Sequence, residues 1–375
     1  MPTFNAAKLS AACVKLKPVM NDGRVVPILG CVVLAVRNGR ATLRGGDGSR
    51  ELTVPLGDAP ISQPMLIPFA ALFAFASGGD DSAEIEIAKG ADAHIILRSG
   101  RRRAKLAVPG DVDEYPAQSD REYPSSVSLP APELASLFAR CLPFVYDGPG
   151  RDMIAGVNLT RVGGELRAMA TDGVSVIRAD GLAQFEGADF GSRTIPADGA
   201  AALVALCKDA LGDARLGIAE SGFLLTVSES AGEAALRLPA IATEFPGERA
   251  EALLAGIPNL SAATLPRKAV LAAVSRVSNI ARTVDSAVWL QAADGELRVA
   301  AKGDTATSDE YMAAMGDVEF CQTAAKTALA IGAFDGEHVT VWPETDQVWR
   351  LADPDDQSVA VAISAYRGGQ APGRE

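Results

Sequence analysis

Apolar positions along the chain follow two spacings, and the order of these spacings recurs. A spacing of three to four residues predicts amphipathic helices, and alternation at every second residue predicts strands. Helical spacing begins near residues 6, 69, 132, 198, 267 and 322, with alternating segments and Gly-containing turns between these points. The pattern predicts an α+β chain of repeated modules, each with two helices packed on antiparallel sheet.

A short strand running into an Asp turn also recurs. Asp47, Asp172 and Asp304 each follow such a strand and lie 125 and 132 positions apart. Near-equal spacing is typical of structural repeats rather than of chance similarity. It predicts three modules and a tail, over residues 1–124, 125–260, 261–368 and 369–375.

The second copy of this turn, Thr171-Asp172-Gly173, has two interpretations. An Asp loop is a candidate for catalysis, whereas a hairpin turn needs only Gly to supply positive φ. The turn is favoured because Asp47-Gly48 repeats it. After Phe245-Pro246, a stretch containing Ala, Gly and Pro up to Asn259 predicts a linker between the second and third modules.

Length and composition indicate a globular chain with more than one core. At 375 residues it is too long for a single hydrophobic core, and its 48% hydrophobic content excludes disorder. The five cysteines are far apart and form no C-x-x-C pair, which argues against a disulfide framework and a zinc site. A net charge of −12 argues against a nucleic-acid partner for the average surface, but individual helix faces can differ from that average.

The sequence carries no targeting signal and no catalytic motif. Its first twenty residues lack the apolar run of a signal peptide, and the most apolar segment, Met65 to Ala76, is too short to span a bilayer. We therefore expect a soluble, cytoplasmic protein. Only His94 and His338 are available, and no nucleophile motif or phosphate-binding loop is found. The sequence predicts a protein that is not an enzyme and has no cofactor and no metal.

Basic side chains lie opposite the apolar stripe on several predicted helices. They are Lys8, Lys15, Arg140, Lys268 and Arg276 on the first helices of the modules, and Lys208 and Lys326 on second helices. Solvation explains any one of them, but their recurrence in an acidic chain indicates a shared positive face. Such a face can hold a polyanion without reading its bases.

Four stretches carry a resemblance to a known family. They are Val26-Pro27-Ile28-Leu29-Gly30, Leu97-Arg98-Ser99-Gly100-Arg101, Glu165-Leu166-Arg167 with Ala170-Thr171-Asp172-Gly173, and Glu244-Phe245-Pro246. In order and spacing they resemble the bacterial DNA polymerase III beta subunit, the beta sliding clamp. The resemblance runs from about Met1 to Arg367.

This resemblance implies the DNA clamp fold, in which a head-to-tail homodimer forms a ring with its sheets outside and its helices lining a hole. The implied function is that of a processivity factor that encircles double-stranded DNA without sequence preference. It would tether the DNA polymerase, the clamp loader and repair proteins through short peptide motifs, with no membrane partner. A clamp-fold scaffold for protein interactions that does not encircle DNA is the alternative.

The resemblance also implies the residues of three sites. The DNA-facing residues are Lys8, Lys15, Arg24, Arg140, Lys208, Lys268, Arg276 and Arg282. The partner-peptide pocket, between the second and third modules, consists of Ile154, Thr171, Gly173, Val174, Val176, Pro246, Val348 and Ile363. The dimer seam contains Ala104, Leu106 and Ile280.

Several positions depart from the family pattern. Val174-Ser175 replaces a usual His-Arg pair, and Ser364-Ala365-Tyr366-Arg367 replaces a usual Met-Pro-Met-Arg ending. Ala104 stands where an aromatic residue is usual, and truncating a buried aromatic side chain costs about 3–5 kcal/mol. We therefore expect a divergent clamp with altered partner choice and a weaker or differently packed dimer.

Overall fold

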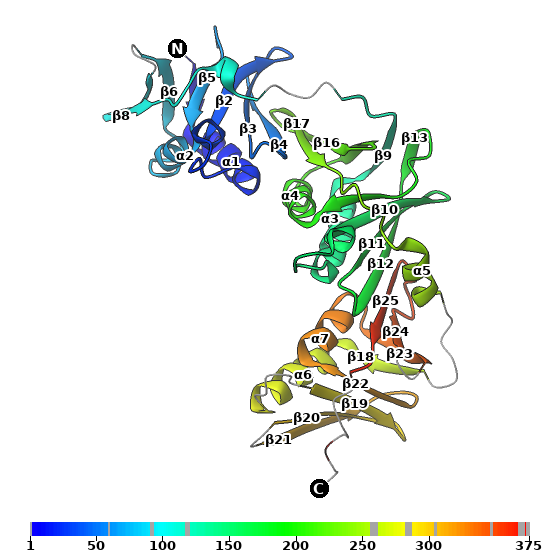
Figure 1. Cartoon of the computed structure of the whole chain (residues 1–375). Helices are drawn as coiled ribbons and strands as arrows, with labels where there is room; N and C mark the ends of the chain where they lie inside the picture. The colour runs from blue at the N-terminus through cyan, green and yellow to red at the C-terminus, as the bar shows by residue number, and fades with distance from the viewer. Residues whose placement is uncertain are drawn as a thin grey trace. The chain divides into compact units, whose positions relative to one another are not determined.

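The computed structural model describes residues 2–58, 61–90, 94–116, 121–255, 262–281, 287–303, 306–345, 348–366 and 372. Seven α-helices and twenty-five strands lie within these described ranges (Figure 1). The helices are α1 Ala6–Leu16, α2 Phe69–Ser77, α3 Ala131–Cys141, α4 Ala197–Cys207, α5 Gly247–Leu254, α6 Arg267–Ala281 and α7 Ala324–Gly332. The chain is thus α+β, as the hydrophobic spacing predicts.

One order of elements recurs three times along the chain: strand, helix, four strands, helix, three strands. The helices of the first copy are α1 and α2, those of the second are α3 and α4, and those of the third are α6 and α7. Strand β13 (Gln184–Gly187) and helix α5 are additions to this order. The recurrence matches the predicted repeat, while the boundaries of the modules stay a prediction.

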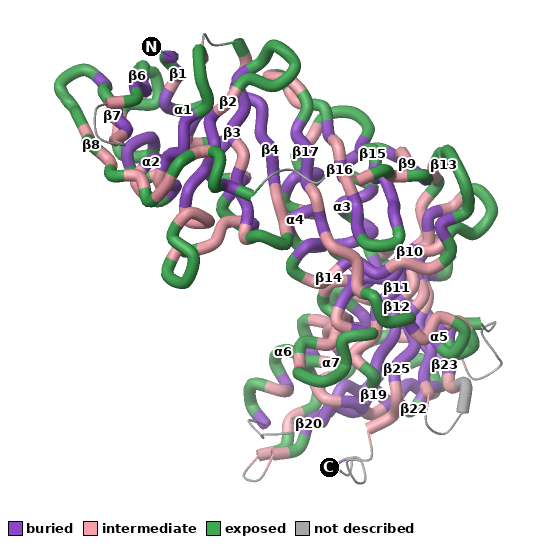
Figure 2. The backbone as a smooth tube through the Cα atoms, turned by 45° about the horizontal axis from the view of Figure 1, so that its top comes forward, coloured by how far each residue is buried: buried purple, intermediate pink, exposed green. Residues whose placement is uncertain are grey.

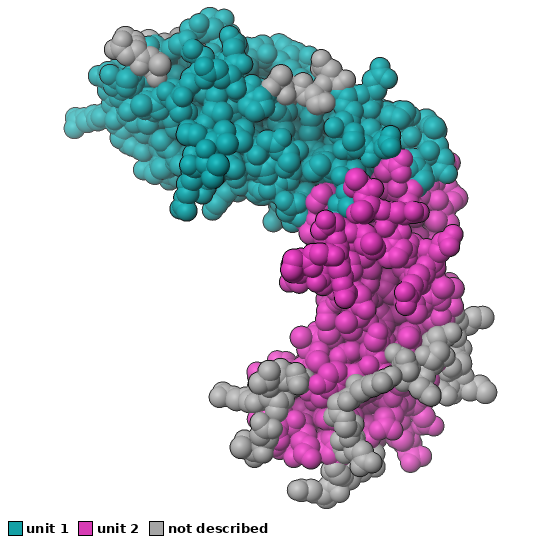
Figure 3. All heavy atoms as spheres, viewed as in Figure 1, with its two compact units in different colours: residues 1–136, 182–191, 198–241 teal, residues 137–181, 192–197, 242–375 magenta. Residues whose placement is uncertain are grey.

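The chain forms two compact units (Figure 3). Unit 1 contains Met1–Ser136, Leu182–Gly191 and Asp198–Ile241, and unit 2 contains Leu137–Gly181, Ser192–Ala197 and Ala242–Glu375. The division falls inside the second predicted module, so each unit takes part of it. The reason is that strands of neighbouring repeats pair with each other within a unit.

Unit 1 has two antiparallel sheets. The smaller has the order β1-β6-β7-β8, with bounds Thr3–Asn5, Glu84–Lys89, His94–Ser99 and Arg102–Ala107. The larger has the order β13-β9-β15-β16-β17-β4-β3-β2-β5. After β13, its strands are Ser125–Pro130, Asp213–Ala219, Gly222–Glu229, Gly232–Pro239, Glu51–Gly57, Arg40–Gly46, Cys31–Arg37 and Met65–Pro68. The pair of β17 and β4, with Leu236 opposite Leu52, joins the first and second repeats.

Unit 2 repeats this arrangement. Its larger sheet has the order β14-β10-β11-β12-β25-β24-β23-β18. Its strands are Arg193–Pro196, Gly156–Val162, Glu165–Thr171, Ser175–Leu182, Val359–Ser364, Val348–Ala352, His338–Thr345 and Ala263–Pro266. The smaller sheet, β21-β20-β19-β22, contains Thr307–Ala313, Glu296–Lys302, Ala287–Ala293 and Val318–Thr323. Here the pair of β12 and β25, with Ile177 opposite Val361, joins the second and third repeats.

Local sequence signals explain where the helices begin. The Asn5 side chain accepts a hydrogen bond from the backbone N–H of Lys8 at 3.2 Å and caps α1, and Thr323 caps α7 in the same way. In α1, Leu9, Cys13 and Leu16 are fully buried. Figure 2 shows the central strands of the larger sheets buried and the connecting turns exposed. The apolar stripes read from the sequence therefore pack against sheet.

Three further findings bear on the sequence predictions. The predicted linker after Pro246 begins with the two-turn helix α5, so that part of the prediction is wrong. The third Asp of the repeat, Asp304, lies outside the described residues. The five cysteines are free thiols, and in the part of the chain that the structure describes no helix is long and apolar enough to cross a membrane.

Candidate functional site

The hairpin between β11 and β12 in unit 2 turns on Asp172. Its Oδ1 accepts hydrogen bonds from the backbone N–H groups of Val174 at 2.8 Å and Ser175 at 2.7 Å. Gly173 has a φ of +87°, a conformation that side chains other than Gly rarely adopt. The predicted interpretation of this motif as a hairpin turn is therefore borne out by its geometry, and Val174 stands 44% exposed at its tip.

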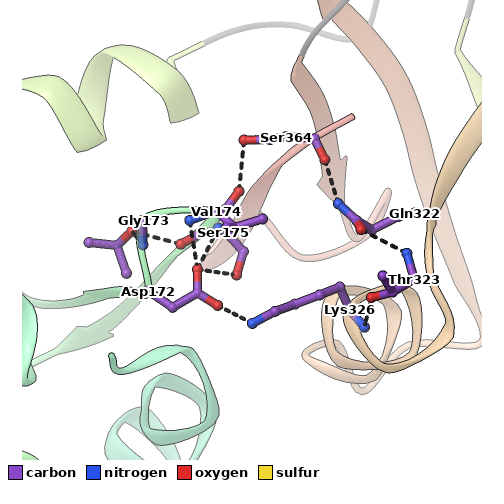
Figure 4. A network of polar contacts seen from close by, with 9 residues as sticks. Asp172, Gly173, Val174, Ser175, Gln322, Thr323, Lys326 and Ser364 are labelled. Carbon is purple, nitrogen blue, oxygen red and sulfur yellow. Dashed lines mark hydrogen bonds and ion pairs between the residues drawn. The ribbon is translucent and has the colours of Figure 1, made fainter. Parts of the chain in front are cut away.

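A polar network ties this hairpin to α7 and β25 (Figure 4). Asp172 Oδ2 forms an ion pair with Lys326 Nζ, from the first turn of α7. The carbonyl of Val174 accepts from the backbone N–H of Ser364 at 2.9 Å and from its hydroxyl at 3.0 Å. Gln322 Nε2 donates to the carbonyl of Ser364 at 2.6 Å. The hairpin tip is thus held from two elements of the third repeat.

The same contacts set the protonation of Asp172. Burial alone raises the pKa of this carboxyl, but the hydrogen bond from Lys326 and those from the N–H groups of Ser175 and Val174 outweigh it. The net pKa lies below the ordinary value of Asp. Asp172 is therefore ionised at neutral pH and acts as a permanent acceptor for the turn.

An apolar cluster lies beside the hairpin, on one face of β11, β12 and β25 and under α5. Its buried members are Ile154, Met169, Val176, Phe245, Ala250, Leu254 and Ala362. Tyr146, Val348 and Ala360 are partly buried and pack against it. Val176 pairs with Ala362 across β12 and β25, so the two small side chains face the same side of the sheet. We call this set the apolar cluster.

Two arginines, one buried and one partly buried, hold α5 over the apolar cluster. Arg350, which is 3% exposed, donates from Nε to the carbonyl of Leu253 at 2.7 Å and from Nη2 to that of Ala252 at 3.2 Å. A cation at a helix C-terminus satisfies carbonyls that have no partner within the helix. Arg167 binds Asp180 at 2.8 Å and Glu251 of α5 at 2.7 Å. These two arginines, from β24 and β11, therefore fix α5 to the sheet.

A hollow of about 680 Å³ opens next to the apolar cluster. Met169, Phe245 and Pro246 give it apolar lining, and Asn158, Thr160 and Ser192 give it neutral polar groups. The charged residues that also line it are Glu244, Glu248, Arg249 and Glu251. An apolar wall with a few polar groups is the usual make-up of a ligand site. The arrangement suits a short peptide that places apolar side chains against the cluster and backbone groups against the amides and hydroxyls.

The residues expected for a partner pocket fall into three groups. Ile154, Val176 and Val348 belong to the apolar cluster, and Thr171, Gly173 and Val174 form the adjoining hairpin. Pro246 precedes α5 and lines the hollow. Ile363 does not join them: it is 1% exposed and alternates on β25 with Ala362, which occupies the cluster instead. The assignment of these residues to a partner pocket stays a prediction.

Several members of the cluster were absent from the expectation. Met169, Phe245, Ala250, Leu254 and Tyr146 all contribute to it. The spacing of Ala250 and Leu254, four residues apart, is the helical signal that was available in the sequence. The Ala, Gly and Pro content of the segment after Pro246 favours a linker and outweighs this short helical spacing.

Most of the expected DNA-facing side chains have acidic partners. Lys15 binds Glu229 at 2.6 Å, and Arg276 makes two bonds of 2.6 Å to Glu310. The other pairs are Arg140 with Asp335, Arg24 with Asp22 at 3.1 Å and Lys208 with Asp209 at 4.0 Å. Lys8 and Lys268 are exposed and, within the described ranges, have no ion-pair partner. Arg282 lies outside the described residues.

Two of the expected seam residues lie on an edge strand, and the third lies on a helix. Ala104 and Leu106 are half-buried on β8, which ends the small sheet of unit 1. Ile280, on α6 of unit 2, is 56% exposed. The other end strand, β21, carries Asp309 and Glu310, whereas β8 carries Arg102, Arg103 and Lys105. Edge strands present unpaired backbone groups, so each is open to a further strand.

In the described part of the chain, no group of three or more His, Cys, Asp or Glu side chains is arranged to hold a metal ion. Comparison of sequences finds no matching family model and no matching curated relative.

Comparison of structures gives a consistent result. The DNA polymerase III subunit beta from Pseudomonas aeruginosa matches with a TM-score of 0.86 and 20% identity, over 98% of this chain and 100% of that one. A sliding clamp of the same organism bound to griselimycin gives 0.88 and 20%, over 98% and 99%. The Caulobacter crescentus beta sliding clamp gives 0.86 and 22%, over 98% and 99%. The chain therefore has, over almost its whole length, the fold of the DNA polymerase III beta subunits, the bacterial sliding clamps.

Proposed function

We propose that this protein is a DNA sliding clamp: a ring of two copies that encircles duplex DNA and tethers the replicative polymerase to it. The observation that carries this proposal is the match to bacterial clamps over 98% of the chain at TM-scores of 0.83 to 0.88. In this role the protein acts in the cytoplasm as a non-catalytic accessory subunit. It catalyses no reaction and keeps the polymerase on DNA, because a closed ring slides along the duplex without binding it tightly.

The free sheet edges support closure by a second copy. Two junctions between repeats are already made by antiparallel strand pairs, β17 with β4 and β12 with β25. In the first and third repeats the strands at the equivalent positions are β8 and β21, and each lies at one end of its sheet. A head-to-tail copy would pair the basic edge β8 with β21, and Ala104, Leu106 and Ile280 would lie in that seam. Opposite charges on facing strands fix the order of assembly.

The paired state of the basic residues fits loose contact with DNA. Each phosphate bound by a free Lys or Arg releases counterions and makes binding strongly dependent on salt. Lys15 and Arg276 already bind carboxylates, so few free cations remain for phosphates. The ring would then be retained by its topology, with Lys8 and Lys268 as the freest contacts.

The apolar cluster and the adjoining hollow are the proposed docking site for partner peptides. Short apolar segments of the polymerase, the clamp loader and repair proteins would place side chains against Val176, Ala362 and Phe245. Two clamps of similar fold are bound to griselimycin, from Pseudomonas aeruginosa and Bartonella birtlesii. We therefore use griselimycin as a probe of this site in the experiments below.

A processivity assay tests the proposed function. The host polymerase III core copies a primed circular template with its clamp loader, with and without this protein, and the product lengths are compared. The proposal expects products at least tenfold longer when the protein is present. Unchanged product length, with a loader that is active on another clamp, would contradict it.

A further inference from the structure

A second hollow lies in unit 1, about 200 Å³ in volume, beside the turn between β3 and β4. Arg50, Glu51 and Arg237 line it together with Tyr115 and Arg121. One water molecule takes about 30 Å³ in the liquid, so the hollow has room for a group of several heavy atoms. We call it the charged hollow.

The charged hollow is the counterpart of the apolar cluster in the preceding repeat, because both are built on the same turn. Asp47 Oδ1 accepts from the N–H groups of Ser49 at 2.9 Å and Arg50 at 2.7 Å. Asp172 makes the same two bonds in the second repeat. Gly48 has a φ of +97°, close to that of its counterpart Gly173. The two backbones therefore turn in the same way.

The strand register after the turn is also the same in both places. Four residues beyond the Asp, Glu51 pairs with Arg237 across β4 and β17. At the equivalent step Val176 pairs with Ala362 across β12 and β25. The aromatic residue before a proline recurs as well, as Tyr115-Pro116 and Phe245-Pro246, and Tyr115 is 5% exposed. The turn, the strand register and the aromatic residue are thus the same in both places. The facing pair is charged beside the first turn and apolar beside the second.

Charge in this hollow is incompletely balanced. Glu51 Oε2 binds Arg44 at 2.6 Å, and its Oε1 lies 3.4 Å from Arg237 Nη1, so one carboxylate serves two guanidinium groups. Arg237 Nε is buried and has no hydrogen-bond partner among the described residues. Arg121 donates to the carbonyl of Ser221 at 3.0 Å and, within the described ranges, meets no carboxylate. The Arg237 side chain is 17% exposed, so its guanidinium is largely removed from water, and a partial partner leaves it favourable to an added anion.

Arg50, by contrast, is already neutralised. It binds Asp47 through two bonds of 2.8 and 2.6 Å and Asp198 of α4 at 3.1 Å. The available donors therefore come from Arg237 and Arg121, which both line the hollow. Arginine donors arranged as a fork match the oxygen pairs of carboxylate and phosphate groups.

We infer that the charged hollow binds a small oxyanion, a carboxylate or a phosphate, through Arg237 and Arg121. Tyr115 and Tyr123 also line the hollow, and their rings suit the apolar part of such a ligand. Binding here requires neither DNA nor a second copy of the chain, so it stands apart from the clamp function. It gives the first repeat a ligand preference opposite to that of the second.

Isothermal titration of the full chain tests this inference. Sodium phosphate and sodium acetate are the two probes, each titrated against sodium chloride of equal ionic strength. We expect saturable binding of at least one probe at one site per chain, absent with chloride. The stronger probe identifies whether phosphate or carboxylate is the preferred source of the oxyanion.

Variants locate the site. Arg237→Met and Arg121→Met should each raise the dissociation constant at least tenfold, and Arg237→Lys should recover part of it. Arg215→Met is the matched control, because Arg215 is 58% exposed and pairs with Glu186 on the same sheet. Circular dichroism confirms folding, and Arg121→Met remains informative if the Arg237 variants do not fold. Absence of saturable binding by both probes, or equal affinity in Arg237→Met, Arg121→Met and Arg215→Met, would overturn the inference.

Discussion

The apolar cluster of unit 2 and the charged hollow of unit 1 are two versions of one structure. Both follow an Asp turn, both lie beside a junction of antiparallel strands, and both have an aromatic residue before a proline. They differ in the pair that faces the site, Val176 with Ala362 in one and Glu51 with Arg237 in the other. The backbone of the repeat therefore fixes where the two places form, and the facing side chains make one apolar and the other charged.

The two turns also differ in what holds them. Asp47 Oδ2 binds Arg50 from its own turn, whereas Asp172 Oδ2 binds Lys326 from α7. The first turn is thus largely self-contained. The second depends on an ion pair with a distant part of the sequence, so the shape of the proposed peptide site depends on α7.

Replacing the apolar pair Val176 and Ala362 by a charged pair should give the largest change in stability. Val176→Glu places an unpaired carboxylate at a position that is 3% exposed, and should lower the free energy of unfolding by about 3–5 kcal/mol. Adding Ala362→Arg should restore part of that loss, because the pair then copies Glu51 and Arg237. Urea unfolding measures both variants, and calorimetry should show that griselimycin no longer binds. Full stability of Val176→Glu with unchanged binding would contradict the burial of this pair.

Loosening α5 is the next largest effect. Arg350→Met leaves the carbonyls of Ala252 and Leu253 without their donor, which should reduce the free energy of unfolding by about 2–3 kcal/mol. Griselimycin affinity should fall as well, since α5 carries Ala250 and Leu254 of the cluster. Arg215→Met serves as the control, with a change within about 0.5 kcal/mol. Equal stability of the two variants would show that Arg350 does not hold the helix.

Breaking the tie to α7 has a smaller effect that depends on pH. The side chains of Lys326 and Asp172 are 31% and 11% exposed, so Lys326→Met should cost about 1 kcal/mol at pH 7. The folded-state pKa of Asp172 is lowered, so this contribution is complete above the unfolded pKa of about 3.9 and is lost as pH falls through the folded value. Urea unfolding at pH 7 and at low pH measures the difference between wild type and variant.

The control for this pair is Lys208→Met, because Lys208 lies 4.0 Å from Asp209 with its side chain 61% exposed. It should change stability by less than about 0.5 kcal/mol at either pH. A difference between wild type and Lys326→Met that stays constant down to low pH would rule out the ion pair as its source.

The smallest expected effect is the difference in cost between matched substitutions in the two turns, which should be close to zero. Gly48→Ala and Gly173→Ala should each cost about 1–2 kcal/mol through strain at positive φ, and by the same amount within error. An added Cβ at Gly48 meets Leu29 Cδ1 at 3.5 Å, and at Gly173 it meets only the flexible end of Arg151. Thermal unfolding of both variants would expose any difference. Unequal costs would mean that the turns are not equivalent.

The sequence predicts the fold well because its strongest signals are local. Six of the seven described helices follow from hydrophobic spacing, and the Asp turn follows from Gly173. Helix α5 has only eight residues and begins at a Gly after a Pro, so its local composition suggests a linker. On β25 the sequence does not distinguish Ala362 from Ile363 as the residue that faces the apolar cluster, since a shift of one residue along a strand reverses its face.

Long-range pairing is the part that sequence does not reveal. Arg276 and Glu310 lie 34 residues apart, and Lys326 and Asp172 lie 154 apart. No local sequence pattern predicts either ion pair. The basic helix face was therefore expected to be more positive than it is. The charged hollow depends on Arg237 meeting Glu51, 186 residues away, and emerges only when the strands are paired.

The central claim is that the protein is held on DNA by topology, and one measurement tests it directly. The protein is loaded by its clamp loader onto a nicked circular plasmid, freed from unbound protein by gel filtration, and divided into two samples. A restriction enzyme linearises one of them, and the amount of protein that remains on DNA is measured in both. A sliding ring stays on the circle and is lost from the linear DNA, whereas equal retention on both would contradict the account.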